Sequence, residues 1–265
     1  MMMSEKNRFS ISDTQKILNS KFIGKKILHF DKVTSTFDKA KEVELSDGLV
    51  IVAKEQTEGK GRLGRVWKSE MGGLYFSLII SANHFLPDLQ FSTIVCALGV
   101  QKAIEKTCNC MIKWPNDIVS KDGKKLCGIL AKTVFSGTDA GFINVGIGIN
   151  TNNSPCSKDL PYASSMKDTI SKEIDENRLM CDVFEQTEKC ILTEKSKILK
   201  EYCEKCITIN SFVRAIYAKT GEGFTGLCIG INEDGSVNIK NENSDIITVN
   251  SGEVSVRGIY GESYV

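Results

Sequence analysis

The sequence predicts an α+β protein with two parts, a body of mixed helices and strands and a smaller all-β barrel. Runs rich in β-branched and aromatic residues, such as 48–56 and 73–80, alternate with helical patterns as far as residue 206. From residue 207 onward, short alternating strands are separated by GEG, EDG and SG turns. The length of 265 residues accommodates one large and one small domain. We expect an N-terminal extension at 1–24, a main mixed domain at 25–206 and the small domain at 207–265.

Apolar spacing and cap residues predict the helices. They are a short helix from Ser12, capped by Ser12 or Asp13; 34–45, opened by Thr34, Ser35 or Thr36; 91–107, capped by Ser92 or the residue before it; a short helix at 164–170; and one long helical stretch over 177–205.

Strands are predicted between these helices. They are 25–33, 48–56, 73–80, two strands within 110–119 that are broken at Pro115 and Asn116, 125–135 and 141–150. A hairpin turn with Asp122-Gly123 at its tip joins the second strand of 110–119 to the strand at 125–135.

Composition excludes several function classes. The 34 basic and 33 acidic residues give a net charge of +1, which creates no field for nucleic acid or an anionic membrane. The longest apolar runs are far shorter than a membrane span, and the N-terminus lacks the apolar segment of a signal peptide. We therefore expect a cytoplasmic protein without DNA or membrane partners. Residues 1–24 are also too few for a DNA-binding module.

Ten cysteines and two histidines limit the chemistry further. Without a secretory signal, most cysteines are expected to be reduced core residues. A four-cysteine zinc site from the CNC (108–110) and CEKC (203–206) pairs is a weak alternative, and we expect no metal held by the protein itself. His29 and His84 are expected to be structural.

A glycine- and arginine-rich segment, residues 57–72, separates two predicted strands; we call it the Gly/Arg loop. Its cations among glycines favour an anion such as phosphate or carboxylate. Residues 59–64 match the pattern G-x-G-x-x-G, but a strand follows the loop where a dinucleotide site or a P-loop requires a helix. The alternative is a basic connection between strands on the surface.

Three other segments carry a structural and a functional interpretation. KWPND (113–117) is either a turn with a buried Trp and an Asp cap or a site with a carboxylate. Lys125 lies where a turn passes into an apolar strand, so it is either solvated or faces a phosphate. Ser35 and Thr36 are either helix caps or hydroxyl groups at a pocket, and local sequence favours caps.

The order GKGRLGRVW, KWPND, KLCGIL and VGIGINTN resembles the bacterial biotin–protein ligases (biotin–[acetyl-CoA-carboxylase] ligases), over roughly residues 28–262. The resemblance implies a mixed-sheet catalytic domain of the class II synthetase-like, biotin/lipoate ligase type and an SH3-like C-terminal domain. It also implies a two-step reaction. Biotin and ATP, with Mg²⁺, give biotinyl-5′-AMP and pyrophosphate, and a lysine of the biotin carboxyl carrier protein then takes the biotin.

The resemblance also implies site residues, motif by motif. Those matching the biotin-binding positions are Ser35, Thr36, Gln56, Lys60, Gly61, Arg62, Lys125 and Gly128. Those matching the ATP and adenylate positions are Arg62, Arg65, Trp67, Lys125 and Asn150, and the implied catalytic residues are Lys125, Arg62 and Asp117.

Two positions depart from the family pattern. The family loop usually reads GRGR, whereas this chain has Lys60, which keeps the charge but loses the bidentate fork of arginine. The Ser-Thr pair is usually followed by Asn, whereas this chain has Phe37. A polar contact from that side chain is therefore not expected.

Three alternatives remain at this point. A lipoate- or octanoate-handling enzyme shares the catalytic fold, but the KWPND turn and the small terminal domain favour biotin. A biotin-responsive repressor would need a DNA-binding domain, and a purely binding module would not need cations for phosphate. The resemblance allows a homodimer through the central sheet, but it identifies neither the carrier proteins modified nor the order of substrate binding.

Overall fold

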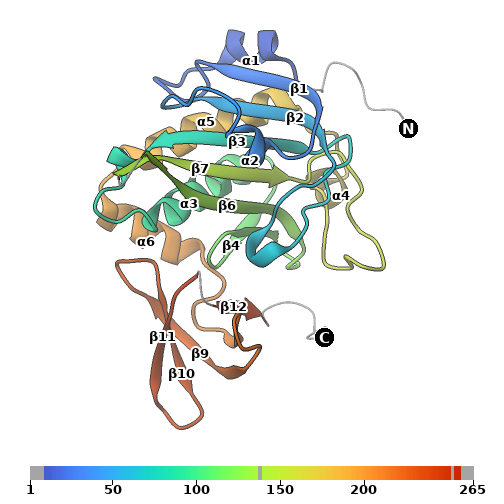
Figure 1. Ribbon diagram of the computed structural model, residues 1–265. Helices are drawn as coiled ribbons and strands as arrows, with labels where there is room; N and C mark the ends of the chain where they lie inside the picture. The colour runs from blue at the N-terminus through green and yellow to red at the C-terminus, as the bar shows by residue number, and fades with distance from the viewer. Residues whose placement is uncertain (1–8, 137–138, 252–253, 258–265) are drawn as a thin grey trace.

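The computed structural model describes residues 9–136, 139–251 and 254–257. Seven strands form one mixed sheet in the order β1-β2-β3-β7-β6-β5-β4 (Figure 1). β1 and β2 are parallel, and the other neighbouring pairs are antiparallel. The strands are β1 (Ile27–Val33), β2 (Val50–Gln56), β3 (Leu74–Ser81), β4 (Cys110–Lys113), β5 (Asp117–Ser120), β6 (Lys125–Ser136) and β7 (Asp139–Ile149). The predicted strands of the body are confirmed.

Helices α3 (Phe91–Glu105), α5 (Glu176–Ile191) and α6 (Lys195–Lys205) cover one face of this sheet, behind it in Figure 1. The main core lies between them, and Phe76 of β3 meets Phe184 of α5 edge to face at 5.9 Å. α3 is buried almost all round because it is apolar on every side. The short helix α2 (Thr36–Lys39) lies on the opposite face, against β2, β3 and β7.

Alternation along β7 separates these two faces. Val145, Ile147 and Ile149 belong to the main core, whereas Gly146, Gly148 and Asn150 line a cavity on the opposite face. Side chains of a strand point alternately to the two faces of the sheet, so one segment serves both. The apolar half of VGIGIN therefore packs under the helices, and the glycine half leaves room above the sheet.

Four details of the helices differ from the sequence prediction, and two of them concern the caps. The first helix, α1 (Ile11–Ile17), is capped by Ser10, whose hydroxyl accepts from the Asp13 amide, so the proposed caps Ser12 and Asp13 are wrong. α3 starts after Gln90 without a side-chain cap, and the Ser92 hydroxyl instead donates to the Leu89 carbonyl.

α2 has a single turn, not the twelve residues predicted for 34–45, although its predicted cap Ser35 is confirmed. Past Lys39 the chain unwinds because Ala40, Val43 and Leu45 pack on a second small core with Ile51. The long stretch 177–205 is also two helices, not one. The chain breaks at Leu192–Glu194, where the Thr193 hydroxyl donates to the Lys189 carbonyl and competes with helix propagation.

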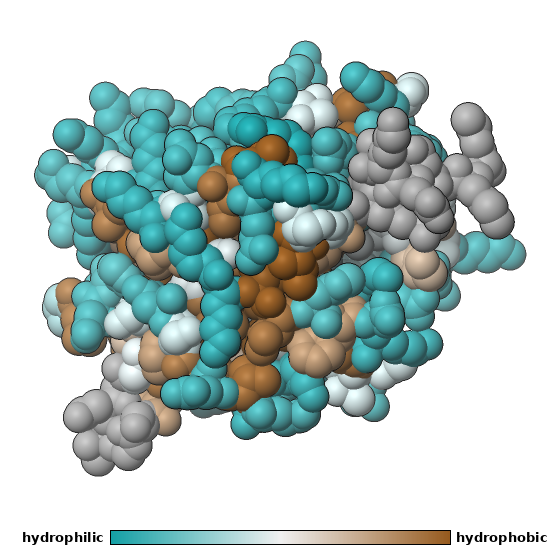
Figure 2. Space-filling view, turned by 90° about the horizontal axis from the view of Figure 1, so that it is seen from above, coloured by the Kyte–Doolittle hydropathy of each residue, from teal (hydrophilic) through white to brown (hydrophobic). Residues whose placement is uncertain are grey.

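The described part of the N-terminal segment is fastened to α5. The Glu188 carboxylate accepts from the backbone amides of Lys21, Phe22 and Ile23, and Ile23 is fully buried. Seen from above in Figure 2, the end of the molecule near α1 and β1 is largely hydrophilic around an apolar strip. α4 (Met166–Ile170) lies in the long connection after β7.

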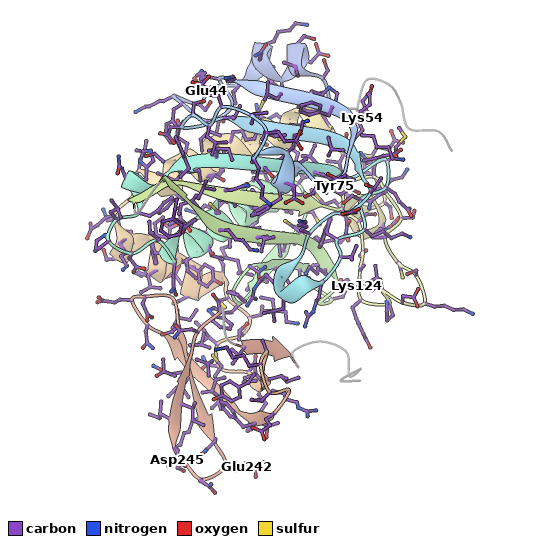
Figure 3. The ribbon with its side chains drawn as sticks, in the orientation of Figure 1. Glu44, Lys54, Tyr75, Lys124, Glu242 and Asp245 are labelled. Carbon is purple, nitrogen blue, oxygen red and sulfur yellow. The ribbon has the colours of Figure 1, made fainter. Side chains whose placement is uncertain are left out.

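Residues after Ile207 form a separate antiparallel sheet of five described strands in the order β11-β10-β9-β8-β12. They are β8 (Phe212–Tyr217), β9 (Gly223–Ile231), β10 (Val237–Asn241), β11 (Ile246–Val249) and β12 (Val254–Arg257). Glu242 and Asp245 mark the far tip of this part (Figure 3). The α+β class with an all-β C-terminal part is confirmed, while the domain boundaries stay a prediction.

Trp114 joins the two sheets. Its indole Nε1 donates to the Gly235 carbonyl at 2.9 Å, and its backbone amide donates to the Thr208 hydroxyl at 2.9 Å. The side chain is 2% exposed, which assigns it to packing and not to the cavity. The structural interpretation of KWPND therefore holds for Trp114.

Candidate active site

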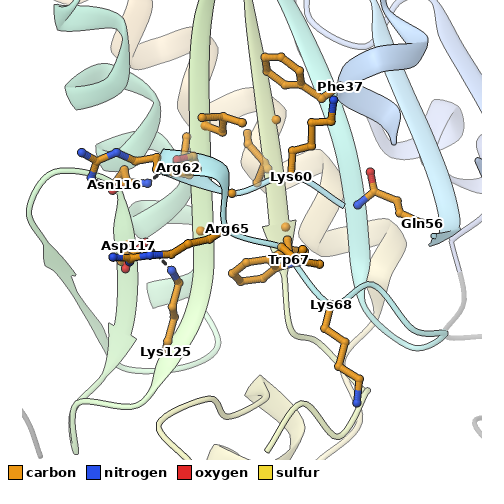
Figure 4. Close-up of a pocket in the computed structure, with 18 of the residues that line it drawn as sticks. Phe37, Gln56, Lys60, Arg62, Arg65, Trp67, Lys68, Asn116, Asp117 and Lys125 are labelled. Carbon is orange, nitrogen blue, oxygen red and sulfur yellow. Dashed lines mark hydrogen bonds and ion pairs between the residues drawn. The ribbon is translucent and has the colours of Figure 1, made fainter. Parts of the chain in front are cut away.

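A cavity of about 290 Å³ opens on the face of the seven-stranded sheet that carries α2. The Gly/Arg loop forms one wall, and the starts of β5 and β6 and the end of β7 form the others (Figure 4). All the predicted site residues line it, namely Ser35, Thr36, Gln56, Lys60, Gly61, Arg62, Arg65, Trp67, Asp117, Lys125, Gly128 and Asn150. The structure thus brings one set together from five separate segments, and the ligand contacts of its members stay predictions.

One end of the cavity holds uncharged hydrogen-bonding groups. The Gln56 carbonyl oxygen accepts from the Thr36 amide at 2.8 Å and from the Thr36 hydroxyl at 3.1 Å. The Gln56 amide nitrogen donates to the Ser69 hydroxyl at 2.8 Å, which fixes its orientation. Ser35 caps α2 by accepting from the Phe37 amide at 3.2 Å, and it also lines the cavity. The helix-cap and pocket interpretations of Ser35 are thus compatible.

The other end is charged. The Lys125 ammonium lies 2.8 Å from the Asp117 carboxylate and 5.2 Å from the centre of the Trp67 ring. Arg62 is half-buried, and this burial lowers its pKa, which the Asp117 charge partly restores while the Arg65 charge lowers it further. A guanidinium starts from so high a pKa that Arg62 remains cationic at neutral pH. This end can therefore attract and orient an anion.

Paired glycines form the floor beneath Trp67. Gly128 of β6 and Gly148 of β7 face each other in the ladder. A Cβ atom at Gly148 would lie 2.3 Å from the Trp67 Nε1, and one at Gly128 would lie 2.8 Å from the Trp67 Cζ3. Both positions therefore require glycine for the indole to lie flat against the sheet. Gly148 was not among the predicted site residues, although the alternation in VGIGIN marks it.

The two departures from the family pattern have distinct structural outcomes. The Phe37 ring packs against Gly146, where a Cβ would lie 3.0 Å from its Cδ2, so this position supplies an apolar wall. Lys60 forms an ion pair with Asp38 of α2, and its side chain points toward that helix beside Phe37 (Figure 4). Sequence reasoning did not identify Asp38, because no local pattern relates it to the loop.

Asn116 was also missed, although it lies within KWPND. Its side-chain oxygen accepts from Arg62 Nη1 at 3.0 Å, and its side-chain nitrogen donates to the Ile129 carbonyl. Arg62 Nη2 donates in addition to the backbone carbonyls of Ser251 and Val254, at the edge of the second sheet. The arginine at the middle of the loop is therefore fastened to both parts of the protein.

The resemblance implies Mg²⁺, and the donor set can be judged against it. Of the described residues that line the cavity, Asp117 is the sole carboxylate. Mg²⁺ is commonly bound through one or two carboxylates together with substrate phosphates, so this set fits an ion held mainly by a nucleotide. Among the described residues, no three His, Cys, Asp or Glu side chains are grouped as a metal centre requires, which leaves the zinc alternative without support.

All ten cysteines are free, and eight are buried, as expected for reduced core residues. Burial raises their pKa, for example that of Cys190 and of Cys228 to about 11. Within the ranges that the structure describes, no helix combines the length and apolarity needed to cross a bilayer.

Comparison with known proteins gives a consistent result. The model of the biotin/lipoate A/B protein ligase family matches residues 27–150. The bifunctional ligase/repressor BirA of Bacillus subtilis (strain 168) is 30% identical over 252 residues, which span 88% of this chain and 75% of the relative. The biotin–[acetyl-CoA-carboxylase] ligase of Mycobacterium tuberculosis is 27% identical over 71% of this chain and 72% of its own length.

Solved structures agree with these relatives. A biotin protein ligase from Aquifex aeolicus in complex with biotin and ATP is 30% identical, with a TM-score of 0.77, and the match covers 88% of this chain and 99% of that one. A protein from Helicobacter pylori, described as a biotin acetyl coenzyme A carboxylase synthetase, has a TM-score of 0.62 at 23% identity and so supports the fold.

Proposed function

This chain belongs to the biotin/lipoate A/B protein ligase family, and on that premise we propose that it is a biotin–protein ligase. It activates biotin with ATP to biotinyl-5′-AMP and transfers the biotin to a lysine of the biotin carboxyl carrier protein of acetyl-CoA carboxylase. The similarity to named biotin ligases supports this assignment. Its main structural support is a cavity that has neutral hydrogen-bonding groups at one end and cations at the other.

The polar end of the cavity is suited to the head group of biotin, which offers several hydrogen-bonding atoms. Ser35, Thr36 and Gln56 would bind it, and the Phe37 ring and Gly146 would pack against its apolar part. Octanoate and lipoate lack a comparable head group, so a lipoate- or octanoate-transferring enzyme of the same fold is the less favoured function.

In the first step, a carboxylate oxygen of biotin forms a bond to the α-phosphorus of ATP, and the bond to the leaving pyrophosphate breaks. Both reactants are anions, so Lys125, Arg62 and Arg65 are needed to offset their repulsion. Mg²⁺ would supply further charge neutralisation on the phosphates, with Asp117 as the side-chain oxygen available to it. The Trp67 ring would lie against the adenine, and Asn150 would contact the nucleotide.

In the second step, the amine of the acceptor lysine attacks the carbonyl carbon of the mixed anhydride, and AMP leaves. The amine must lose a proton to attack, and Asp117 is the carboxylate that would accept that proton or orient the amine. The adenylate is prone to hydrolysis, so the Gly/Arg loop must exclude water while it waits for the acceptor.

Location and assembly belong to the same proposal. A cytoplasmic enzyme would meet ATP and the carrier protein, and free buried thiols suit a reducing compartment. A homodimer could form along β1, an edge strand whose apolar residues Ile27, Leu28 and Phe30 are only half-buried. Figure 2 shows an apolar strip at this end of the molecule.

Pyrophosphate exchange into ATP is the direct test of the function. Biotin, lipoate and octanoate are offered separately to the purified chain, and exchange is expected with biotin alone. Exchange with lipoate or octanoate, and none with biotin, would overturn the assignment in favour of the alternative.

Asp117→Asn tests the second step. Because the amide accepts protons poorly but keeps the shape of the carboxylate, single-turnover transfer from pre-formed adenylate should slow by about 10²-fold. Transfer is measured with labelled biotin and a biotin carboxyl carrier domain. A variant that transfers biotin at the full rate would show that Asp117 has no part in it.

A further inference from the structure

Two cationic side chains of the Gly/Arg loop, Arg62 and Lys60, hold it to other segments in surroundings that differ. Arg62 is half-buried and donates to Asn116 and to two backbone carbonyls of the second sheet. Lys60 is paired with Asp38 of α2, and the side chains of this pair are 44% and 23% exposed. An ion pair in such surroundings is weak and can open readily, whereas several hydrogen bonds to a half-buried guanidinium hold more firmly. Of these two side-chain contacts, the Lys60–Asp38 pair is therefore the one that opens more readily.

Asp38 occupies a position from which it connects the loop to the wall of the cavity. It lies on the same single-turn helix as Thr36, whose amide and hydroxyl both donate to Gln56. Its other partner is Lys41 at 2.9 Å, which belongs to the following turn and does not reach the loop. Burial raises the pKa of Asp38, but the hydrogen bonds and the charges of Lys60 and Lys41 together lower it below its usual value, so the carboxylate stays charged.

We propose that Asp38 is a positioning residue for the adenylation reaction, acting through Lys60. Its carboxylate holds the Lys60 ammonium across the mouth of the cavity and so keeps the Gly/Arg loop closed over the bound adenylate. Lys60 then contributes to closure of the loop and not to charge at the phosphates, which explains how lysine replaces the usual arginine here. This inference rests on the proposed function for the identity of the ligand.

The test measures how fast biotinyl-adenylate leaves the enzyme after biotin and ATP have formed it. At about 0.05 M salt, Asp38→Asn and Lys60→Met should each release it about two- to fivefold faster, the range expected for an exposed ion pair. Lys60→Arg should release the adenylate at the wild-type rate, because arginine can form the same ion pair with Asp38. At about 0.5 M salt, the variants and the wild type should converge, because screening weakens the pair.

Matched controls come from the same helix. Lys41→Gln removes the other partner of Asp38, and Glu42→Gln removes the Lys39–Glu42 pair, whose atoms are 2.5 Å apart. Neither control should change the release rate. The double variant Asp38→Lys with Lys60→Asp should release adenylate more slowly than Asp38→Lys alone or Lys60→Asp alone. Each of these two single variants places like charges together, and the double variant restores an opposite-charge pair.

Equal release by Asp38→Asn and wild type at low salt would overturn the inference, as would an effect that persists unchanged at high salt. Pyrophosphate exchange is measured in the same samples. If biotin-dependent exchange persists while the release rates are equal, the closure role of Asp38 fails and the proposed function stands. If the wild type forms no biotinyl-adenylate, both fail.

Discussion

The two faces of the seven-stranded sheet are built from the same strands but have different roles. One face packs against the helices, and the other lines the cavity. Toward the helices, β7 presents Val145, Ile147 and Ile149 to the main hydrophobic core. Toward the cavity, it presents Gly146, Gly148 and Asn150, and the neighbouring strand adds Gly128. Burial of large apolar side chains on the first face stabilises the fold. The small residues on the second face bury less apolar surface and leave room for a ligand. Substitutions on the two faces should therefore have separable consequences.

Lys125→Met should have the largest effect, and it should appear in activity alone. Removing the cation from the charged end of the cavity is expected to lower biotin-dependent pyrophosphate exchange about 10³-fold, or about 4 kcal/mol of transition-state stabilisation. The Lys125–Asp117 pair is partly exposed, so the free energy of unfolding in urea should change by less than about 1 kcal/mol. A variant that lost stability instead of activity would contradict the division between the faces.

Ile149→Ala tests the opposite face. Its side chain is fully buried under the helices, so truncation should leave a cavity and lower the free energy of unfolding by about 3 kcal/mol. Urea denaturation gives the stability, and exchange assays below the unfolding transition give the KM for biotin, which should stay within about twofold of wild type. A large rise in KM with unchanged stability would show that this face also shapes the site.

Gly148→Ala is the neighbouring counterpart on the cavity face. The added methyl group would meet Trp67 Nε1 at 2.3 Å, so the indole must move away from the sheet. We expect the KM for ATP in the exchange assay to rise about tenfold or more, with a loss of stability of about 2 kcal/mol. Gly230, where an added Cβ meets nothing within 4 Å, supplies the control Gly230→Ala. An equal KM for ATP in the two variants would contradict the proposal that the Trp67 ring lies against the adenine.

The smallest effect concerns pH and the buried thiols of the helix-covered face. Burial raises the pKa of Cys190 to about 11 in the folded protein, from about 9 when unfolded. This group costs no stability below about pH 9, and stability is lost as pH rises from 9 through 11, by about 1 kcal/mol at pH 10. Comparing urea unfolding of Cys190→Ala and of the exposed-site variant Cys156→Ala at pH 8 and pH 10 isolates this contribution. The loss between these pH values should be smaller in Cys190→Ala alone, and equal losses in both variants would contradict it.

Local sequence patterns predicted much of the fold because strand and helix periodicities depend on near neighbours. The strands from β1 to β7 and the change to a second, all-β part after α6 follow from them. The same patterns failed where tertiary packing competes with local preference, as where α2 stops after one turn and the predicted helix over 177–205 breaks at Leu192. Motif resemblance supplied the site residues, and the structure gathers them around one cavity.

By itself, then, the sequence determined the alternation that divides the sheet into a packed face and an open one, and the cations of the Gly/Arg loop. Only the tertiary structure decided where those cations are directed. Arg62 meets Ser251, 189 residues away, and Lys60 meets Asp38 on a helix that precedes it by a strand. Such contacts depend on how distant segments pack, and no spacing along the chain encodes that. Lys60 keeps the charge of the usual arginine without its bidentate fork, and in the folded chain its ammonium pairs with Asp38.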